Sequence, residues 1–410
     1  MTRIFETRRQ WLLRTQRLAI ASAAGSALGT AGVVRTLGAL AAPAAALAWP
    51  RHARAQGTPG VSDTTILIGR SAGLTGSLAA RMKPATEAME AYFASVNAAG
   101  GVLGRRLRLI SVDDGNDPAR AAENTRRLVD EQRVFVMFAN SGTPQTVAAV
   151  KVLQERGVPL VGTTSGADSV QAHHPLVFHY KASYGQELAR IATHLKTIGM
   201  QRVALVYSPD PTGEEGRRLA EAALKAQGIQ LVAVSSTKPE DAARLLAGFA
   251  TAAPQAVVLT ALAGPGATFY KQLVQVPTPP QVFTWSVAGV EAIHKEVGER
   301  IRGLVVSQVF PSPQSQVSRL AVEYRQLVES NRLADGGYPG MEGYVSARIL
   351  VEGLRRAGRE LTRERLAEAL RSLRGFDLGS GDLVTFGPND HVGRNFVELT
   401  MVGANGRFVR

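Results

Sequence analysis

The sequence predicts an α/β protein with two Rossmann-like lobes, each built on a parallel central sheet. Apolar segments of period two alternate with amphipathic segments of period about 3.6, a pattern typical of strands followed by crossover helices. The alternation starts again after residues 176–183, and the 410-residue chain exceeds the size of about 250 to 300 residues at which single cores stop growing. We therefore expect two lobes, with connections between them near Lys181 and Phe310.

The first set of elements is bounded by helix start and stop signals. Asp117 is an expected N-cap with Pro118 at the first helical position, and Gly157 follows a helix as its stop. Strands are expected at 65–70, 106–114, 134–140 and 158–164, and helices at 85–97, 117–132 and 143–156.

The second set repeats the pattern and continues into a tail. Strands are expected at 202–208, 229–236, 256–262, 281–287 and 303–310. Helices are expected at 184–198, 213–227, from 241, and at 266–275, 291–299, 317–330, 339–357 and 363–373. The tail carries the turn residues Asn389-Asp390, Gly393 and Asn405-Gly406, which predict hairpins.

The formal net charge of +13 is concentrated at the N-terminus. Residues 1–55 hold eight Lys or Arg and one acid, so the remainder carries +6. This remainder has no basic run interleaved with aromatics, which argues against nucleic-acid binding. The chain contains no cysteine, which excludes disulfides, thiolate catalysis and Cys-ligated zinc. We expect neither a cofactor nor a metal.

Residues 1–55 have the pattern of a twin-arginine-like export signal. Arg8 and Arg9 precede a weakly hydrophobic, Ala- and Gly-rich stretch, and Ala53-Arg54-Ala55 offers a small-x-small cleavage site before Gln56. A membrane anchor is the alternative, but alanine and glycine contribute little transfer energy to a bilayer. We expect the twin-arginine export machinery to deliver the folded protein to the bacterial periplasm.

Two loops at the ends of predicted strands form the candidate ligand site. Ser141, Gly142 and Thr143 follow one strand, and Ser165 with Gly166 follows the next. Ligands bind beyond the carboxyl ends of parallel strands, where helix N-terminal amides and small hydroxyls favour an anion such as a carboxylate. Helix capping by serine and threonine is the alternative for each loop.

Enzyme motifs are mostly missing from the chain. The GxxxxGK[ST] and HExxH patterns are absent, and the adjacent His173 and His174 are better explained by an exposed loop than by a metal site. Tyr184, Trp285 and Phe310 fall near predicted strand ends or crossovers, where they would contact a ligand. A position in the core is the alternative for each of these aromatics.

From about Thr64 to its C-terminus, the chain resembles the periplasmic solute-binding proteins of the leucine/isoleucine/valine-binding class. These are type I binding proteins that feed ABC importers. The most specific segments are VNAAGGVLG and DDGNDP. The others are ILIGRSAGLTGSLA, the SGTP loop, GVPLVGTTSGAD, YKASYGQE and EGYVSARILVEGLRRAG.

The resemblance implies two lobes joined by three crossovers that close on a ligand. The first lobe would contain residues 56–181 and 308–375, and the second residues 182–307 and 376–410. In the family's amino-acid binders, the loops matching Ser141 to Thr143 and Ser165 to Gly166 hold the ligand's carboxylate.

Three positions depart from those amino-acid binders. Ser286 stands near the acid that binds the α-ammonium group, Thr212 near a tyrosine of the second lobe, and Arg81 near the tyrosine of the first loop. A buried ammonium without a carboxylate partner is costly, so we expect an amine-free organic or aromatic acid, with Arg81 as a second anion contact.

The predicted function is that of a monomeric solute-binding protein that brings its ligand, chemically unchanged, to an ABC permease in the inner membrane. Ligand binding would shift the population toward a closed shape. A sensor module for a membrane receptor is one alternative, and neighbouring importer or kinase genes would separate the two. An exported α/β enzyme is the other alternative, which recovery of an altered ligand would favour.

Overall fold

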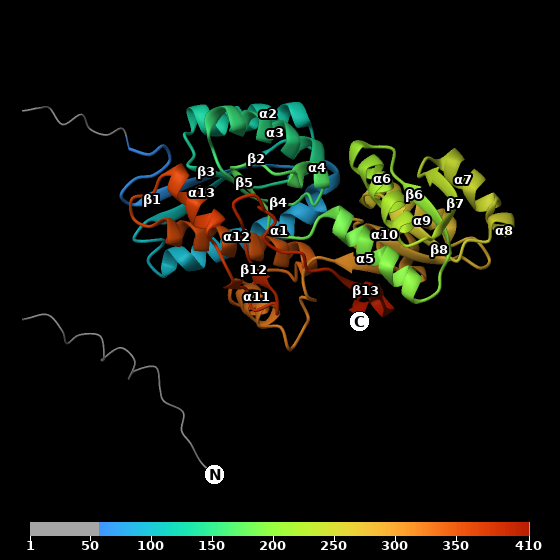
Figure 1. The fold of residues 1–410 in the computed structure, drawn as a ribbon. Coiled ribbons are helices and arrows are strands. Elements are labelled where there is room, and N and C mark those ends of the chain that lie inside the picture. Colours follow the sequence, from blue (N-terminus) through green and yellow to red (C-terminus); the bar gives the residue numbers. More distant parts are fainter. Residues whose placement is uncertain (1–56, 410) are drawn as a thin grey trace, which may run out of the picture. The chain divides into compact units, whose positions relative to one another are not determined.

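A computed structural model describes residues 57–409. They contain two sheets of mostly parallel strands with helices on their faces, so the predicted α/β class and the two lobes are confirmed (Figure 1). The predicted export signal at residues 1–55 lies outside the described residues. Within residues 57–409, no helix combines the length and the apolar character needed to span a bilayer.

The first sheet has five parallel strands in the order β2-β1-β3-β4-β5. The strands are β1 (Thr65–Ala72), β2 (Arg106–Asp113), β3 (Val136–Asn140), β4 (Leu160–Thr163) and β5 (Val177–Phe178). The helices between them are α1 (Ala79–Ala98), α2 (Pro118–Arg126), α3 (Thr143–Arg156) and the short α4 (Asp168–Gln171). Because the strands are parallel, their carboxyl ends meet at one edge of the sheet.

The second sheet has seven strands in the order β14-β13-β10-β9-β8-β6-β7. Its parallel strands are β6 (Arg202–Tyr207), β7 (Gln230–Ser236), β8 (Ala256–Thr260), β9 (Gln281–Thr284) and β10 (Val305–Gln308). β13 (Glu398–Val402) and β14 (Phe408–Val409) are antiparallel additions at one edge. The helices are α5 (Tyr184–Thr197), α6 (Pro211–Ala226), α7 (Pro239–Ala247), α8 (Phe249–Ala252), α9 (Ala263–Leu273) and α10 (Val290–Val297).

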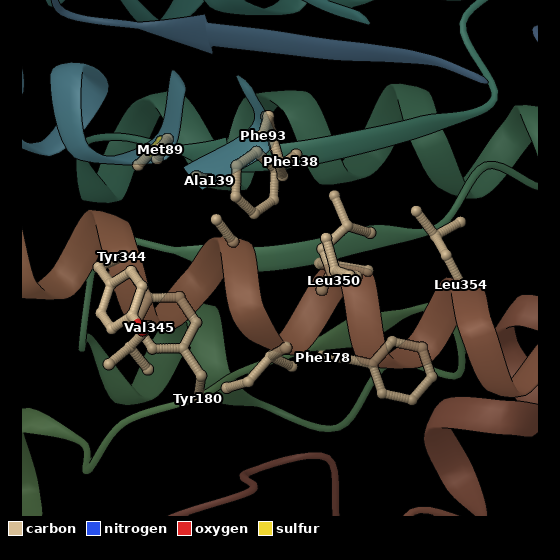
Figure 2. Packing of buried hydrophobic residues seen from close by; sticks show 14 of the residues in the cluster. Met89, Phe93, Phe138, Ala139, Phe178, Tyr180, Tyr344, Val345, Leu350 and Leu354 are labelled. Atoms are coloured by element: carbon tan, nitrogen blue, oxygen red, sulfur yellow. The ribbon is translucent and has the colours of Figure 1, made fainter. Parts of the chain in front are cut away.

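After β10 the chain returns to the first lobe through three helices, α11 (Arg319–Ser330), α12 (Gly337–Ala357) and α13 (Arg363–Arg371). α12 lies beside α1 (Figure 1). The apolar side chains of α12, among them Val345, Leu350 and Leu354, are buried in one core with Phe138 of β3 (Figure 2). The long apolar face of α12 therefore completes the first lobe.

The sequence predicted that the chain passes into the second lobe after residue 375. In the structure the chain joins the second sheet later, at β13. β11 (Phe376–Asp377) pairs with β12 (Leu383–Val384) in a small antiparallel sheet. Val384 and Phe386 pack in the same core as β3 and α12, and the chain joins the second sheet only at β13. Strands this short carry no periodicity that could indicate which core they join.

Local signals predicted several element ends. The Asp117 side chain accepts a hydrogen bond from Arg120 N at 2.9 Å, so its role as N-cap is confirmed. Asn405-Gly406 lies between the antiparallel β13 and β14, as expected for a hairpin. The predicted start of α1 was wrong, because the helix begins at Ala79 rather than residue 85 and contains Pro84, which gives up one backbone hydrogen bond.

Two buried histidines fasten the tail to the first crossover. His179 N donates to His391 O at 2.8 Å, and the His391 ring stacks on Phe178 with 4.4 Å between centroids. Both histidines are almost completely buried. Burial lowers the pKa of His179 from 6.5 to about 3 and also lowers the pKa of His391.

We expect the free energy of unfolding to fall as the pH drops below the ordinary histidine pKa. His179 is neutral in the folded state and gains a proton on unfolding, so its contribution is complete above about pH 6.5 and is lost progressively below it. From about pH 7.5 to about pH 5, this loss amounts to about 2 kcal/mol. Urea unfolding at both pH values should show a smaller loss for His179→Gln than for the wild type; equal losses would contradict this role.

Candidate functional site

A cavity of about 790 Å³ lies at the carboxyl ends of strands from both sheets. Five helices that directly follow β1, β3, β6, β8 and β9 begin on its wall, and α12 begins there as well. With α5, whose first residue Tyr184 lines the cavity, seven helices have an N-terminus there: α1, α3, α5, α6, α9, α10 and α12. Parallel strand topology produces this convergence, because each strand delivers the next helix start to the same edge.

These helix N-termini bring the positive ends of helix dipoles to the cavity wall. Two of the seven have a capping side chain. Asp210 accepts from Thr212 N at 2.9 Å and Gly213 N at 3.0 Å at the start of α6, and Ser183 caps α5. The N-cap residues of the other five make no side-chain cap hydrogen bond, although Gly337 N at the start of α12 donates to Asp335 Oδ1 at 3.0 Å. Uncapped N–H groups and the positive ends of the helix dipoles attract negative charge.

Six of the predicted site residues line this cavity: Arg81, Gly142, Thr143, Ser165, Tyr184 and Thr212. The two predicted loops meet, since the hydroxyl oxygens of Thr143 and Ser165 are 2.8 Å apart. Tyr184 begins α5, which a capping box between Ser183 and Gln186 starts at this point. Local helix signals in the sequence therefore place these side chains at one site.

The backbone entering the first loop is held in an unusual conformation. Ala139 has φ 48°, a left-handed value that is strained for a residue with a Cβ. Its carbonyl accepts a hydrogen bond from Nε of the fully buried Arg70 at 3.0 Å. Gly142 follows with φ 78° as the N-cap of α3. Arg70 thus supports the turn that brings Thr143 to the cavity.

Ser141 and Gly166 belong to these loops but do not line the cavity. The Ser141 hydroxyl is fully buried and accepts a hydrogen bond from Gly73 N at 2.8 Å. The Gly166 carbonyl accepts from Tyr184 N at 2.7 Å. A Cβ on Gly166 would lie 2.9 Å from the Tyr184 ring, so this glycine allows the close approach of Tyr184. Both residues shape the loops from behind.

Two of the three predicted aromatic contacts lie in the core instead. Trp285 is fully buried, donates from Nε1 to Ala261 O at 3.0 Å and packs against Tyr184 with 4.7 Å between ring centroids. Phe310 is 2% exposed and stacks on Tyr180. Among the described cavity residues, Tyr184 is therefore the single aromatic ring.

Ser286 also lies outside the described cavity wall. Its N and Oγ donate to the Glu187 carboxylate at 2.8 and 2.9 Å, and Ser307 Oγ donates to the same carboxylate at 2.5 Å. Glu187 is 1% exposed, and burial raises its pKa despite these hydrogen bonds. Glu187 ties α5 to the ends of β9 and β10.

Arg81 contacts both lobes. Its side chain is 20% exposed at the cavity wall and forms an ion pair with Glu342 of α12. Its Nη1 also donates to the Ser286 carbonyl, beyond the end of β9, at 3.4 Å. Burial alone would lower the pKa of Arg81, but the Glu342 carboxylate outweighs burial and raises it.

Several charged residues at this site were not predicted from the sequence. Lys83, Glu87, Asp210, Glu291 and Asp335 line the cavity. Glu342 lies behind the cavity wall. Its one sequence signal was that it is an acid within a largely apolar helix, next to Met341, where a buried charge requires partners. Among the described residues, no group of three or more His, Asp or Glu side chains is arranged to hold a metal.

Known proteins share this fold and much of this sequence pattern. A family model described as periplasmic binding protein matches residues 65–407. Leu/Ile/Val-binding protein homolog 3 of Brucella melitensis is 23% identical over 331 residues, which are 78% of this chain and 86% of that protein. An amino acid binding protein of Pseudomonas aeruginosa is 26% identical over 176 residues, which are 35% of this chain and 46% of the relative.

A solved structure also resembles this chain closely. It is that of a possible leucine/isoleucine/valine-binding protein from Rhodopirellula baltica, with 28% identity and a TM-score of 0.78. The match covers 86% of this chain and 98% of that chain.

Ser141→Ala should lower the free energy of unfolding by about 1 to 3 kcal/mol, because it leaves a buried Gly73 N–H without its acceptor. Thr143→Ala is the matched control, since it removes a hydroxyl from the same loop without touching that hydrogen bond. Urea unfolding of both variants measures the difference. A Ser141→Ala protein as stable as the wild type would show that this hydroxyl does not support the loop.

Proposed function

Since this chain belongs to the periplasmic binding protein family, we propose that it captures a small carboxylate-bearing solute between its lobes and delivers it to an ABC importer. An amine-free organic acid is the preferred ligand. In this proposal the protein is exported by the twin-arginine machinery, works in the periplasm as a monomer and leaves the ligand chemically unchanged.

The convergence of seven helix N-termini on one cavity is the observation that carries the proposal. A carboxylate placed there would receive N–H groups, the Thr143 and Ser165 hydroxyls, and the Arg81 guanidinium. Apolar residues such as Leu78, Met82 and Val287 complete the wall and suit an aliphatic body. A single wall aromatic, Tyr184, gives less support to an aromatic acid than to an aliphatic one.

The preference for an amine-free acid rests on Ser286. By the resemblance, this position stands near the ammonium-binding acid of the family's amino-acid binders, yet it brings no charge. The nearby Glu187 carboxylate is already occupied by Ser286 and Ser307 and lies outside the described wall. An ammonium directed to this position would remain unpaired, at a cost in binding free energy.

An amino acid is the second candidate ligand, and a different observation favours it. Asp210 and Glu291 line the same cavity from the second lobe, where either carboxylate would pair with an ammonium group. The curated relatives are also named as amino-acid or Leu/Ile/Val-binding proteins.

Closure of the lobes would provide the signal to the importer. Helices of the two lobes are already in contact. Ser169 of α4, in the first lobe, donates from N and Oγ to the Glu215 carboxylate of α6, in the second lobe, at 2.9 and 2.7 Å. A ligand that contacts both walls would add to such contacts and stabilise the closed arrangement. The same closure would serve a sensor, so transport of the ligand by a reconstituted importer distinguishes the two roles.

A thermal-shift comparison of matched compounds tests the ligand class. We expect 4-methyl-2-oxopentanoate or another amine-free acid to raise the melting temperature more than leucine does. At a concentration of ~100 Kd, the expected rise is at least about 3 °C. The uncharged 4-methylpentanamide should have no effect, because it lacks the carboxylate. Mass spectrometry of compounds that co-purify with the protein provides an independent identification.

Two results would change the proposal. Stabilisation by leucine but by none of the amine-free acids would replace the preferred ligand with an amino acid. Equal stabilisation by the acid and the amide would show that the helix N-termini and Arg81 do not recognise a carboxylate.

A further inference from the structure

A fully buried carboxylate lies directly behind the cavity wall. Glu342 of α12 is 0% exposed and accepts hydrogen bonds from three donors. These are Arg81 Nη2, Lys181 Nζ at 2.5 Å and the Tyr180 hydroxyl at 3.1 Å. The donors come from α1 and from the crossover that follows β5, so one carboxylate joins three segments of the chain.

The charge balance of this cluster is positive. Burial would raise the pKa of Glu342, but the Lys181 ammonium and the Arg81 guanidinium outweigh burial and hold it below its usual value. Two cations therefore surround one anion. Removal of the carboxylate would leave two positive charges close together with little water, which is strongly unfavourable.

Both cations of the cluster also hold parts of the cavity wall. Lys181 Nζ donates to the carbonyl of Thr164 at 2.7 Å, and Thr164 lines the cavity beside Ser165. Arg81 lines the cavity itself. Glu342 thus connects the loop of Thr164 and Ser165, through Lys181, with the guanidinium of Arg81.

Arg81 has few other restraints. Apart from Glu342, its one hydrogen bond among the described residues is the 3.4 Å contact from Nη1 to the Ser286 carbonyl of the second lobe. Its Nε is buried without a partner in the described part of the chain. A long side chain with four rotatable bonds adopts one orientation only when something fixes its end, and Glu342 is the group that does so here.

We propose that Glu342 is a positioning residue for ligand binding: it fixes the Arg81 guanidinium at the cavity wall and links it through Lys181 to the crossover between the lobes. The part of this inference that concerns ligand binding rests on the proposed function, in which Arg81 contacts the ligand's carboxylate. Its structural part, the immobilisation of Arg81, does not depend on any ligand.

The first experiment follows Arg81 without a ligand. In a ¹H–¹⁵N spectrum of the full chain, the Nε–H signal assigned by its loss in Arg81→Gln should show the relaxation of a rigid group. Glu342→Gln should make this signal mobile. Glu323→Gln is the matched control. Glu323 of α11 pairs at 2.7 Å with Arg348 of α12, the helix that carries Glu342, and this pair lies away from the cavity. It should leave the Arg81 signal rigid.

The second experiment is a double-mutant cycle on affinity, with 4-methyl-2-oxopentanoate and leucine as probes. Arg81→Gln and Glu342→Gln should each weaken binding by about 10- to 100-fold, as expected for loss of a charged hydrogen bond. Because Glu342 acts through Arg81, the double variant should be at most about 3-fold weaker than Arg81→Gln alone. Glu342→Asp, which keeps the charge, should restore part of the affinity.

The outcomes separate the two proposals. A rigid Arg81 signal in Glu342→Gln, or additive losses of affinity, would overturn the positioning role and leave Glu342 as a structural ion-pair partner. If Arg81 becomes mobile in Glu342→Gln but the wild type binds neither probe nor any other carboxylate of the thermal-shift comparison, the proposed function fails while the immobilisation of Arg81 by Glu342 is supported.

Discussion

The parallel arrangement of the strands is the constraint on which this molecule depends. Each parallel strand must be followed by a crossover, and the helix of that crossover starts at the strand's carboxyl end. Two such sheets therefore bring several helix N-termini to one cavity, where their N–H groups lie beside the charged side chains of the wall. The anion preference that we propose for the site would in this sense be a property of the topology, and the hydroxyls of Thr143 and Ser165 would refine it.

Buried charges add a second level of organisation. Arg70 supports the strained turn at Ala139, Glu187 joins α5 to the ends of β9 and β10, and Glu342 joins Arg81 to Lys181. Buried ions are stabilising only when their partners are complete, so each cluster fixes the segments that supply those partners. All three clusters involve residues at or next to the carboxyl ends of strands. The geometry of the ligand loops is therefore set from inside the lobes rather than at the surface.

The fold and the positions of the two predicted loops at the ends of β3 and β4 were predictable because they depend on local signals. Alternation of strand and helix patterns, the cap at Asp117 and the hydroxyl-rich ends of β3 and β4 are all visible over a few neighbouring residues. The orientation of Trp285 and Phe310 was not predictable, because period two fixes a face of a strand but not the depth of a side chain beneath a loop. Glu342 was missed for a related reason, since its partners lie more than 160 positions away in the chain.

The place of Trp285 has a practical consequence. Residues 57–409 contain no other tryptophan, and this indole lies against Tyr184, which forms part of the ligand cavity. Trp285 is therefore a natural optical probe in contact with one residue of the cavity wall. We expect its emission to report changes at the cavity wall without a dye or a label.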